Sequence, residues 1–252
     1  MSASFIGVDL AWQSEGRNSG LAAIEGDQDG GEVVRFGEGA SALDAVMGFI
    51  LANQAETTVV AIDAPLIIQN PEGQRPCETL ISRRFGGAHA GAHTTNLKRY
   101  PNAASVALGH QLEAQGFRHC SPPGTAWTAA GHWFFEVYPH PAQVVLFQRD
   151  RIIKYKKGSI AAKRRGLAEL REEIRARILG HGMIRSSPSL VQYLSLDLDS
   201  LRGSALKHYE DALDAIVCSF LAYYLWRWGW QRSEFFGDLV SGYIVVPSKP
   251  LV

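Results

Sequence analysis

The chain has 252 residues, 46% of them hydrophobic, and its 25 Lys and Arg balance 25 Asp and Glu to a formal net charge of zero. This size predicts one domain over residues 1–252, with room for a large insertion. The neutral balance counts against a strong basic field for nucleic acid. No apolar run approaches the roughly 18 residues that a membrane-spanning helix needs, so we expect no membrane partner.

The three cysteines, Cys77, Cys120 and Cys218, lie far apart. An odd number at wide spacing argues against a disulfide framework and against a zinc site. The N-terminus lacks the basic segment and uninterrupted apolar run of a secretory signal. We therefore expect a cytoplasmic protein.

The N-terminal region predicts three strands. An almost unbroken apolar run at residues 5–10 is typical of a buried central strand. Residues 20–24 and 32–36 predict two more strands, and the turn signal Asp29-Gly30-Gly31 joins them as a hairpin.

The next region combines a helix, a strand and a long irregular segment. Ser41 is a candidate N-cap for a helix over residues 41–53, and the β-branched run 57–62 predicts a fourth strand. Residues 69–131 are rich in Gly, Pro, Ala and His and have weak periodicity. Because compact domains rarely hold a structureless loop beyond about 12–15 residues, we expect an insertion that covers the site as a lid.

Four further elements complete the chain. Residues 132–137 predict a fifth strand, and residues 159–179 predict a basic amphipathic helix. Residues 204–228 predict a long apolar helix, and residues 242–247 predict a short final strand. A hairpin followed by strand–helix units predicts an α/β fold with a mixed β-sheet flanked by helices.

Carboxylates recur where the predicted strands end. Asp9, Asp63 and Glu136 each follow an apolar run, and Asp211 and Asp214 share one face of the last helix. Because open α/β sheets present functional groups at the carboxyl ends of strands, we expect these five acids to be catalytic residues of one site. The four aspartates are candidate ligands of Mg²⁺ or Mn²⁺, since hard cations take oxygen ligands and two such ions assist phosphodiester cleavage.

Several segments together resemble one protein family. They are Gly7-Val8-Asp9, Ala61-Ile62-Asp63-Ala64-Pro65-Leu66, Arg75-Pro76-Cys77-Glu78, Phe135-Glu136-Val137-Tyr138-Pro139-His140-Pro141, Asp211-Ala212-Leu213-Asp214-Ala215 and Ile244-Val245-Val246-Pro247. The chain resembles, over almost its whole length, the bacterial and archaeal DUF429 family, which is described as a predicted nuclease of RNase H-like fold. The resemblance implies an RNase H-like sheet with the insertion after the fourth strand, and metal-dependent phosphodiester hydrolysis.

The resemblance also implies a role for each acid. In RNase H-like nucleases the first-strand Asp binds both metal ions, and that position is Asp9 here. Asp63 would be the fourth-strand ligand, and either Asp211 or Asp214 the ligand from the C-terminal helix. Glu136 lies on the fifth strand and departs from this pattern, so it would be an extra ligand or the partner of an arginine in the insertion.

Five basic residues are candidates for phosphate or substrate binding: Arg75, Arg83, Arg84, Lys156 and Lys207. Arginine suits bidentate contacts to phosphate. Residues 149–177 hold eleven Lys and Arg against four Asp and Glu. Such a cluster predicts either contact with nucleic-acid phosphates or a solvated helix face. We expect a nucleic-acid partner, DNA or RNA, and leave room for a small phosphodiester and for a homo-oligomer.

Two other functions stay open. An actin-like or sugar-kinase-type phosphotransferase also begins with a Gly–Asp strand, but its Gly- and Thr-rich phosphate loops do not follow Asp9 or Asp63 here. A non-catalytic nucleic-acid-binding protein of the same fold would hold several carboxylates in one cleft without a cation, which is costly. His140 is either a general base or an ordinary strand-end histidine.

Overall fold

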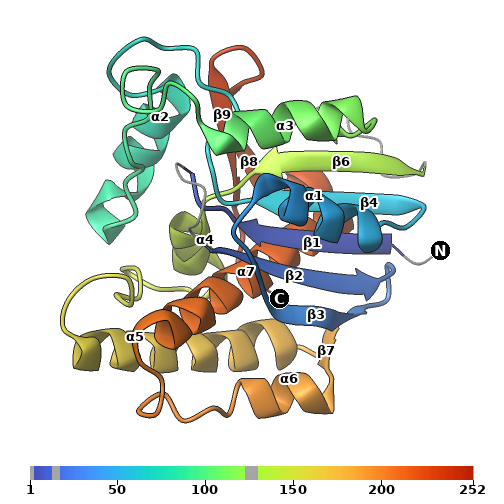
Figure 1. Ribbon diagram of the computed structural model, residues 1–252, viewed down its shortest axis with the longest axis vertical. Coiled ribbons are helices and arrows are strands. Elements are labelled where there is room, and N and C mark those ends of the chain that lie inside the picture. Colours follow the sequence, from blue (N-terminus) through green and yellow to red (C-terminus); the bar gives the residue numbers. More distant parts are fainter. Residues whose placement is uncertain (1–2, 13–17, 123–129, 252) are drawn as a thin grey trace.

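The computed structural model describes residues 3–12, 18–122 and 130–251. In this part of the chain, seven strands form a central sheet in the order β5-β6-β4-β1-β2-β3-β7 (Figure 1). The strands are β1 (Ala3–Asp9), β2 (Ser19–Gly26), β3 (Gly31–Ala40), β4 (Thr57–Ile62), β5 (Arg118–His119), β6 (Gly131–Glu136) and β7 (Ile184–Ser186). β1, β2 and β3 pair antiparallel, and the remaining neighbours in the sheet pair parallel. The predicted mixed α/β sheet is therefore confirmed.

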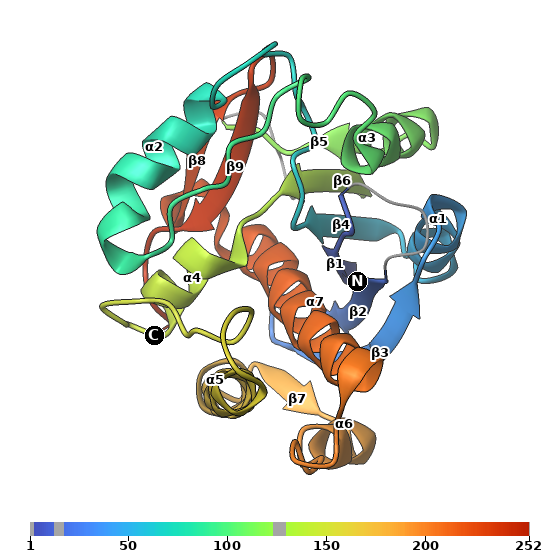
Figure 2. The same cartoon turned by 60° about the vertical axis from the view of Figure 1, so that its left-hand side comes forward.

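The two faces of the sheet are covered by different helices. Along β1, Phe5 belongs to a large core that includes α7 (Gly203–Trp228), whereas Ile6 belongs to a second core that includes α1 (Leu43–Ala52) and α3 (Ala104–Ala114). This alternation follows from the two-residue repeat of a strand. Figure 2 shows α7 crossing one face of the sheet, with α1 and α3 on the other.

Two glycines allow α7 to lie directly on the strands. A Cβ atom on Gly7 would lie 2.1 Å from the Ala215 carbonyl oxygen and 2.2 Å from the Ser219 nitrogen. A Cβ atom on Gly20 would lie 2.1 Å from the carbonyl oxygen of Asp211. No side chain fits in these gaps, so the backbones of β1 and β2 touch the backbone of α7. This close approach determines how near Asp211 and Asp214 of α7 lie to the ends of β1 and β2.

The segment 69–131 divides between two parts of the fold. Its first helix, α2 (Pro76–Phe85), packs against a separate hairpin of β8 (Ser233–Asp238) and β9 (Gly242–Pro247), and the short η1 (Gly86–Ala88) follows it. Its later elements belong to the main layers, since α3 packs on the sheet and β5 pairs with β6. β9 coincides with the predicted final strand, whereas β8 has no counterpart in the prediction.

Helices complete the remaining connections. They are α4 (Pro139–Leu146), α5 (Ile160–Glu173), the π-helical η2 (Ile174–Leu179), α6 (Pro188–Tyr193) and the short η3 (Gly229–Gln231). Ser159 caps α5, because its hydroxyl accepts a hydrogen bond from the Ala162 nitrogen. Ser41 is not the cap of α1, whose N-cap position is Ala42. None of the helices in the described residues combines the length and the apolar character that a membrane span requires.

Candidate functional site

Asp9 and Asp63 lie side by side at one edge of the sheet. β1 and β4 are parallel with Val8 opposite Ile62, and the Asp63 nitrogen donates to the Val8 carbonyl oxygen at 2.8 Å. By strand alternation, Asp9 is on the face of Gly7, against which α7 packs. The parallel register thus brings two carboxylates that are 54 positions apart to one place beside α7.

α7 adds two carboxylates that are almost completely buried. Asp214 is 0% exposed and Asp211 is 1% exposed. The Tyr155 hydroxyl donates to Asp214 Oδ1 at 2.6 Å, and Lys156 Nζ lies 2.9 Å from Asp214 Oδ2. Two aspartates on adjacent helical turns thus face the strand ends.

Asp211 has a different set of partners. Lys207 Nζ, one turn earlier on α7, lies 2.5 Å from its Oδ1, and Asn18 Nδ2 lies 3.5 Å from its Oδ2. The same ammonium group lies 2.8 Å from Glu210 Oε1. The side chain of Lys207 is mostly exposed, so the buried Asp211 and Glu210 have a counter-ion that lies at the protein surface.

Asp9 is buried close to the other three aspartates, and its pKa reflects both facts. Burial raises the pKa of Asp9 well above its ordinary value, Lys156 opposes that rise, and the charges of Asp214, Asp63 and Asp211 add to it. Burial also raises the pKa of Asp63, to about 7, with a further contribution from Asp214. Burial and the neighbouring aspartates thus disfavour the charged forms of Asp9 and Asp63, although Lys156 lies close by.

Both lysines of the cluster remain cationic. Burial lowers the pKa of Lys156, but the nearby charges of Asp214, Asp9 and Asp63 more than compensate, and its pKa is raised well above the ordinary value. Hydrogen bonds and ion pairs to Asp211 likewise raise the pKa of Lys207 against the effect of burial. The acids thus have two fixed ammonium groups as counter-ions.

The oxygen donors suit a hard divalent cation, but they are not arranged as ligands. Within the described residues, no three His, Cys, Asp or Glu side chains are grouped so that they could hold a metal ion as they stand. Asp214 is engaged by Tyr155 and Lys156, and Asp211 by Lys207. An all-oxygen set of donors fits Mg²⁺ or Mn²⁺. A divalent cation could bind to Asp214 or Asp211 as described only if the lysine paired with that carboxylate moved away.

Glu136 lines the same hollow as Asp63, but its carboxylate is paired with an arginine. On β6, Phe134 belongs to the core of α1 and α3, and Glu136 follows it on the same face. Its carboxylate accepts two hydrogen bonds from Arg75, at 2.9 and 2.6 Å, and a third from the Leu66 nitrogen at 3.0 Å. Of the two roles considered for Glu136, the structure shows the pairing with an arginine of the segment 69–131.

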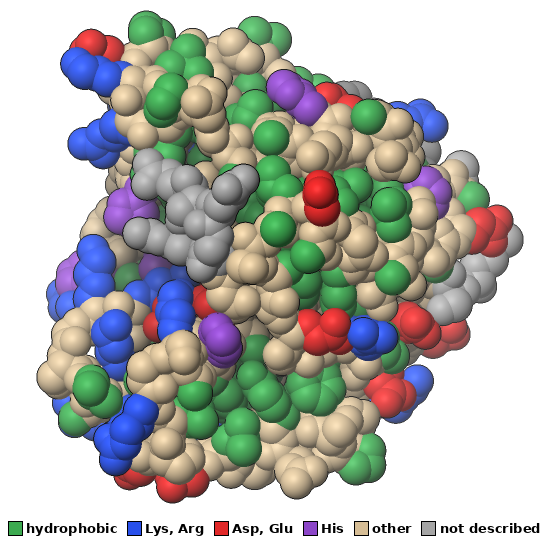
Figure 3. All heavy atoms as spheres, in the orientation of Figure 1, with side chains coloured by type: hydrophobic (Ala, Val, Ile, Leu, Met, Phe, Trp, Pro, Cys, Tyr) green, Lys and Arg blue, Asp and Glu red, His purple; other side chains and the backbone are tan. Residues whose placement is uncertain are grey.

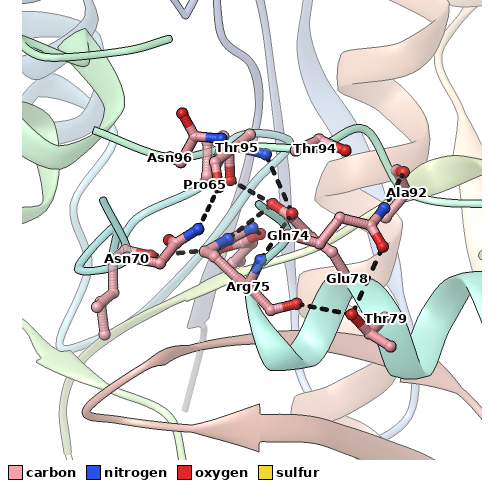
Figure 4. A network of polar contacts seen from close by, with 12 residues as sticks. Pro65, Asn70, Gln74, Arg75, Glu78, Thr79, Ala92, Thr94, Thr95 and Asn96 are labelled. Atoms are coloured by element: carbon pink, nitrogen blue, oxygen red, sulfur yellow. Dashed lines mark hydrogen bonds and ion pairs between the residues drawn. The ribbon is translucent and has the colours of Figure 1, made fainter. Parts of the chain in front are cut away.

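Arg75 anchors a buried polar network at the start of α2. Its Nε donates to Glu78 Oε1 at 2.8 Å, and Glu78 also accepts hydrogen bonds from the Thr95 nitrogen and hydroxyl (Figure 4). Asn70 donates to the Thr95 carbonyl oxygen at 3.0 Å. Arg75 is only 2% exposed, so its guanidinium group is used in buried contacts with Glu78 and Glu136 and has little surface to offer a substrate.

Two hollows reach the pair of strand-end aspartates, one at Asp9 and one at Asp63. One is lined by Asp9, Asn18, Lys207 and Asp211, among others. The second is lined by Asp63 together with Trp12, His93 and Tyr138, among others. Figure 3 shows Lys, Arg and His side chains gathered on the side of the molecule between α2 and α5. An anionic ligand would therefore meet cationic groups around a buried acidic centre.

The other predicted phosphate-binding residues are less closely tied to this centre. Arg83 and Arg84 are exposed in the last turn of α2, and Arg84 lies 3.6 Å from Glu234 of β8. Many arginines of the basic segment 149–177 have acidic partners, such as Arg149 with Glu173 at 2.8 Å. This segment is therefore largely a paired helix surface, with Lys156 as its link to the site.

Two residues near Asp214, Tyr155 and Gln143, were not predicted from the sequence, whereas His140 beside them was a candidate general base. Gln143 Nε2 on α4 donates to the Tyr155 hydroxyl at 3.1 Å, and His140 lies with its ring 6.0 Å from that of Tyr155. Burial lowers the pKa of His140 to about 4, helped by Lys156, so its imidazole is neutral at pH 7. No motif marks Tyr155, because it lies between helices in a region without periodic apolar residues.

A family described as a protein of unknown function, DUF429, matches this chain over residues 7–231. The match includes the end of β1, the whole of α7 and every acid of the site. A comparison with curated proteins gives no match.

Proposed function

We propose that this chain, which belongs to the DUF429 family, is a metal-dependent phosphodiesterase that cleaves nucleic acid. The observation that carries the proposal is the convergence of buried carboxylates from β1, β4 and α7, where burial and the neighbouring aspartates raise the pKa of Asp9. Burying several like charges is costly unless a cation accompanies them. A divalent ion would relieve this repulsion, and phosphodiester hydrolysis is the chemistry that such carboxylate sites assist.

The sheet order supports an RNase H-like fold as part of this proposal. Three antiparallel strands are followed by parallel β4 and β6 on the other side of β1, with the C-terminal helix α7 against β1. RNase H-like nucleases take their acids from the first strand, the fourth strand and the C-terminal helix. Under this proposal, Asp9 at the end of β1, Asp63 directly after β4 and Asp214 in α7 would correspond to those three positions, and Asp211 lies one helical turn before Asp214.

Several residues would have separate roles in the reaction. Asp9, Asp63 and Asp214 would hold Mg²⁺ or Mn²⁺, and such an ion supplies Lewis-acid stabilisation of a phosphoryl group and activation of water. Tyr155 orients Asp214 by its hydrogen bond. Lys207, exposed beside the site, would neutralise phosphate charge.

The test is a cleavage assay on single- and double-stranded DNA and RNA with Mg²⁺ or Mn²⁺. Asp9→Asn removes the central charge and is expected to lower the rate at least about 100-fold, since even residues that only support metal ligands contribute 10–100-fold. Asp150→Asn is the matched control, because Asp150 is exposed and outside the cluster. Cleavage that persists in excess chelator, or in Asp9→Asn, would overturn the proposal.

A further inference from the structure

Lys156 occupies the position at Asp214 that a cation would need. Its Nζ lies 2.9 Å from Asp214 Oδ2, and Asp214 is itself inaccessible to solvent. Lys156 comes from the connection between α4 and α5, 58 positions before Asp214 in the chain. The ion pair is therefore a tertiary contact that depends on how this connection folds over α7.

Both oxygens of Asp214 are engaged by consecutive residues. Tyr155 is fully buried and donates to Oδ1, and Gln143 holds the Tyr155 hydroxyl from the other side. Lys156 engages Oδ2, and its side chain is 32% exposed. Asp214 can offer Oδ2 to another cation only if Lys156 leaves, and Lys156 has solvent into which it can turn.

The charge of Lys156 also reaches the other two proposed ligands. It is the largest opposing influence on the raised pKa values of Asp9 and Asp63. A fixed ammonium group at this position therefore provides part of the neutralisation that a divalent ion would provide. Two cations so close together would repel each other strongly in a partly buried site.

We infer that Lys156 is a built-in counter-ion that competes with the divalent cation for Asp214 and thereby sets the metal affinity of the free protein. The inference rests on the proposed function, because it assumes that Asp214 binds the metal. It assigns Lys156 a regulatory role in place of simple contact with substrate phosphate. Metal binding then requires Lys156 to swing toward solvent.

The test measures the Kd for Mn²⁺ of the metal-free protein by isothermal titration calorimetry at fixed pH and ionic strength. Lys156→Met is expected to bind Mn²⁺ about tenfold more tightly, because it removes both the competing ion pair and the repulsion. Lys156→Arg keeps the charge and is expected to stay near the wild-type Kd. Lys157→Met removes the same charge from the neighbouring exposed residue and is expected to have little effect.

Each result separates the inference from the proposed function. An unchanged or weaker Kd in Lys156→Met, with Mn²⁺ bound by the wild type, overturns the inference and leaves the metal-dependent function standing. Equal tightening in Lys157→Met also overturns it, because the effect would then come from net charge. Failure of the wild type and all of the variants to bind Mn²⁺ overturns both.

A second measurement uses the wild type alone, so it does not depend on the folding of a variant. Lysine acetylation by a small reagent is followed by mass spectrometry with and without saturating Mg²⁺. We expect Mg²⁺ to increase the labelling of Lys156 several-fold and to leave Lys157 unchanged. Lys156 that stays as protected in saturating Mg²⁺ as without it would contradict the displacement.

Discussion

At the residue scale, the five predicted acids divide according to their neighbours. Asp9 and Asp63 have raised pKa values because burial and nearby carboxylates oppose their charge. Burial also raises the pKa of Glu136, but both of its oxygens accept hydrogen bonds from Arg75, which opposes that rise. A carboxylate with a complete set of buried partners has no oxygen to spare for a metal ion. The chemistry of a strand-end acid thus depends on what faces it as much as on its place in the sheet.

Arg75→Met tests the structural role of this pair. It leaves Glu136 and Glu78 without their buried cation, and breaking a buried ion pair in this way typically costs about 3–5 kcal/mol. Urea unfolding should show a loss of that size. Arg84→Met, at an exposed ion pair, should change stability by no more than about 0.5 kcal/mol. A loss below about 1 kcal/mol in Arg75→Met would contradict the assignment.

His140 predicts a dependence of stability on pH. Burial, helped by Lys156, lowers its pKa from 6.5 to about 4, so the unfolded chain takes up a proton at a higher pH than the folded protein does. The stabilisation is thus complete above about pH 6.5 and is lost as the pH falls toward 4.

Relative to His140→Gln, the wild type should therefore lose about 1–3 kcal/mol of unfolding free energy between pH 6.5 and 4. Urea unfolding of both proteins at several pH values measures the difference. His181→Gln, at an exposed histidine, should show no such change. A constant difference between the wild type and His140→Gln would refute the assignment.

At the element scale, the site depends on the contact between β1 and α7. Gly7 and Asp9 share a face of β1, so the residue that admits α7 and the acid that meets it are two positions apart. Asp211 and Asp214 are fixed by the same packing, because α7 is buried along most of its length. One strand–helix contact therefore determines the spacing among three of the four aspartates.

Gly7→Ala is expected to disturb this contact. The new methyl group would lie 2.1 Å from a backbone oxygen of α7, which has no flexible side chain to move aside. We expect a loss of about 1–3 kcal/mol or more in unfolding free energy, as for overpacking, and weaker Mn²⁺ binding.

Gly48→Ala is the matched control for this prediction, because a Cβ at Gly48 in α1 would meet no atom within 4 Å. Removing glycine from a helix interior should stabilise the protein by about 0.5–1 kcal/mol. Thermal and urea unfolding measure both variants. Equal stability of Gly7→Ala and the wild type would show that α7 can move away at little cost.

At the scale of the whole molecule, a chain of zero net charge holds its charges unevenly. The acids are concentrated at the end of β1 and β4 beside α7, and cationic side chains gather around one side of the molecule (Figure 3). Many arginines of the 149–177 segment are paired locally, for example Arg149 with Glu173. Neutrality overall is thus compatible with a strong local field at the site.

This arrangement predicts that divalent cations stabilise the whole fold. A ligand that binds only the folded state at 100 times its Kd adds about 2.7 kcal/mol, which raises the Tm of a protein of this size by about 5–10 °C. Mn²⁺ should produce this shift in the wild type, and chelator should reverse it. Asp9→Asn should show no shift, and an equal shift in that variant would place the stabilising metal elsewhere.

The long periodic elements could be predicted from the sequence because their burial follows a local repeat. β4 coincides with the predicted run 57–62, and α7 and β9 differ from their predictions by at most one residue. The edge strands β5 and β7 were not predicted, since two or three residues carry no clear period. β8, with six residues, was not predicted either. These strands depend on partners that are distant in the chain.

The sequence by itself determined which acids end strands or share a helix face, because alternation and helical spacing are local properties. Only the tertiary structure decided their partners. Glu136 meets Arg75 across 61 positions, and Asp214 meets Tyr155 and Lys156 across 59 and 58. Burial, and with it the pKa of Asp9 and Asp63, depends on every element packed around a group. The protonation state of a buried group is thus a property of the assembled fold. A local sequence pattern specifies where an acid lies, but not its partners or its pKa.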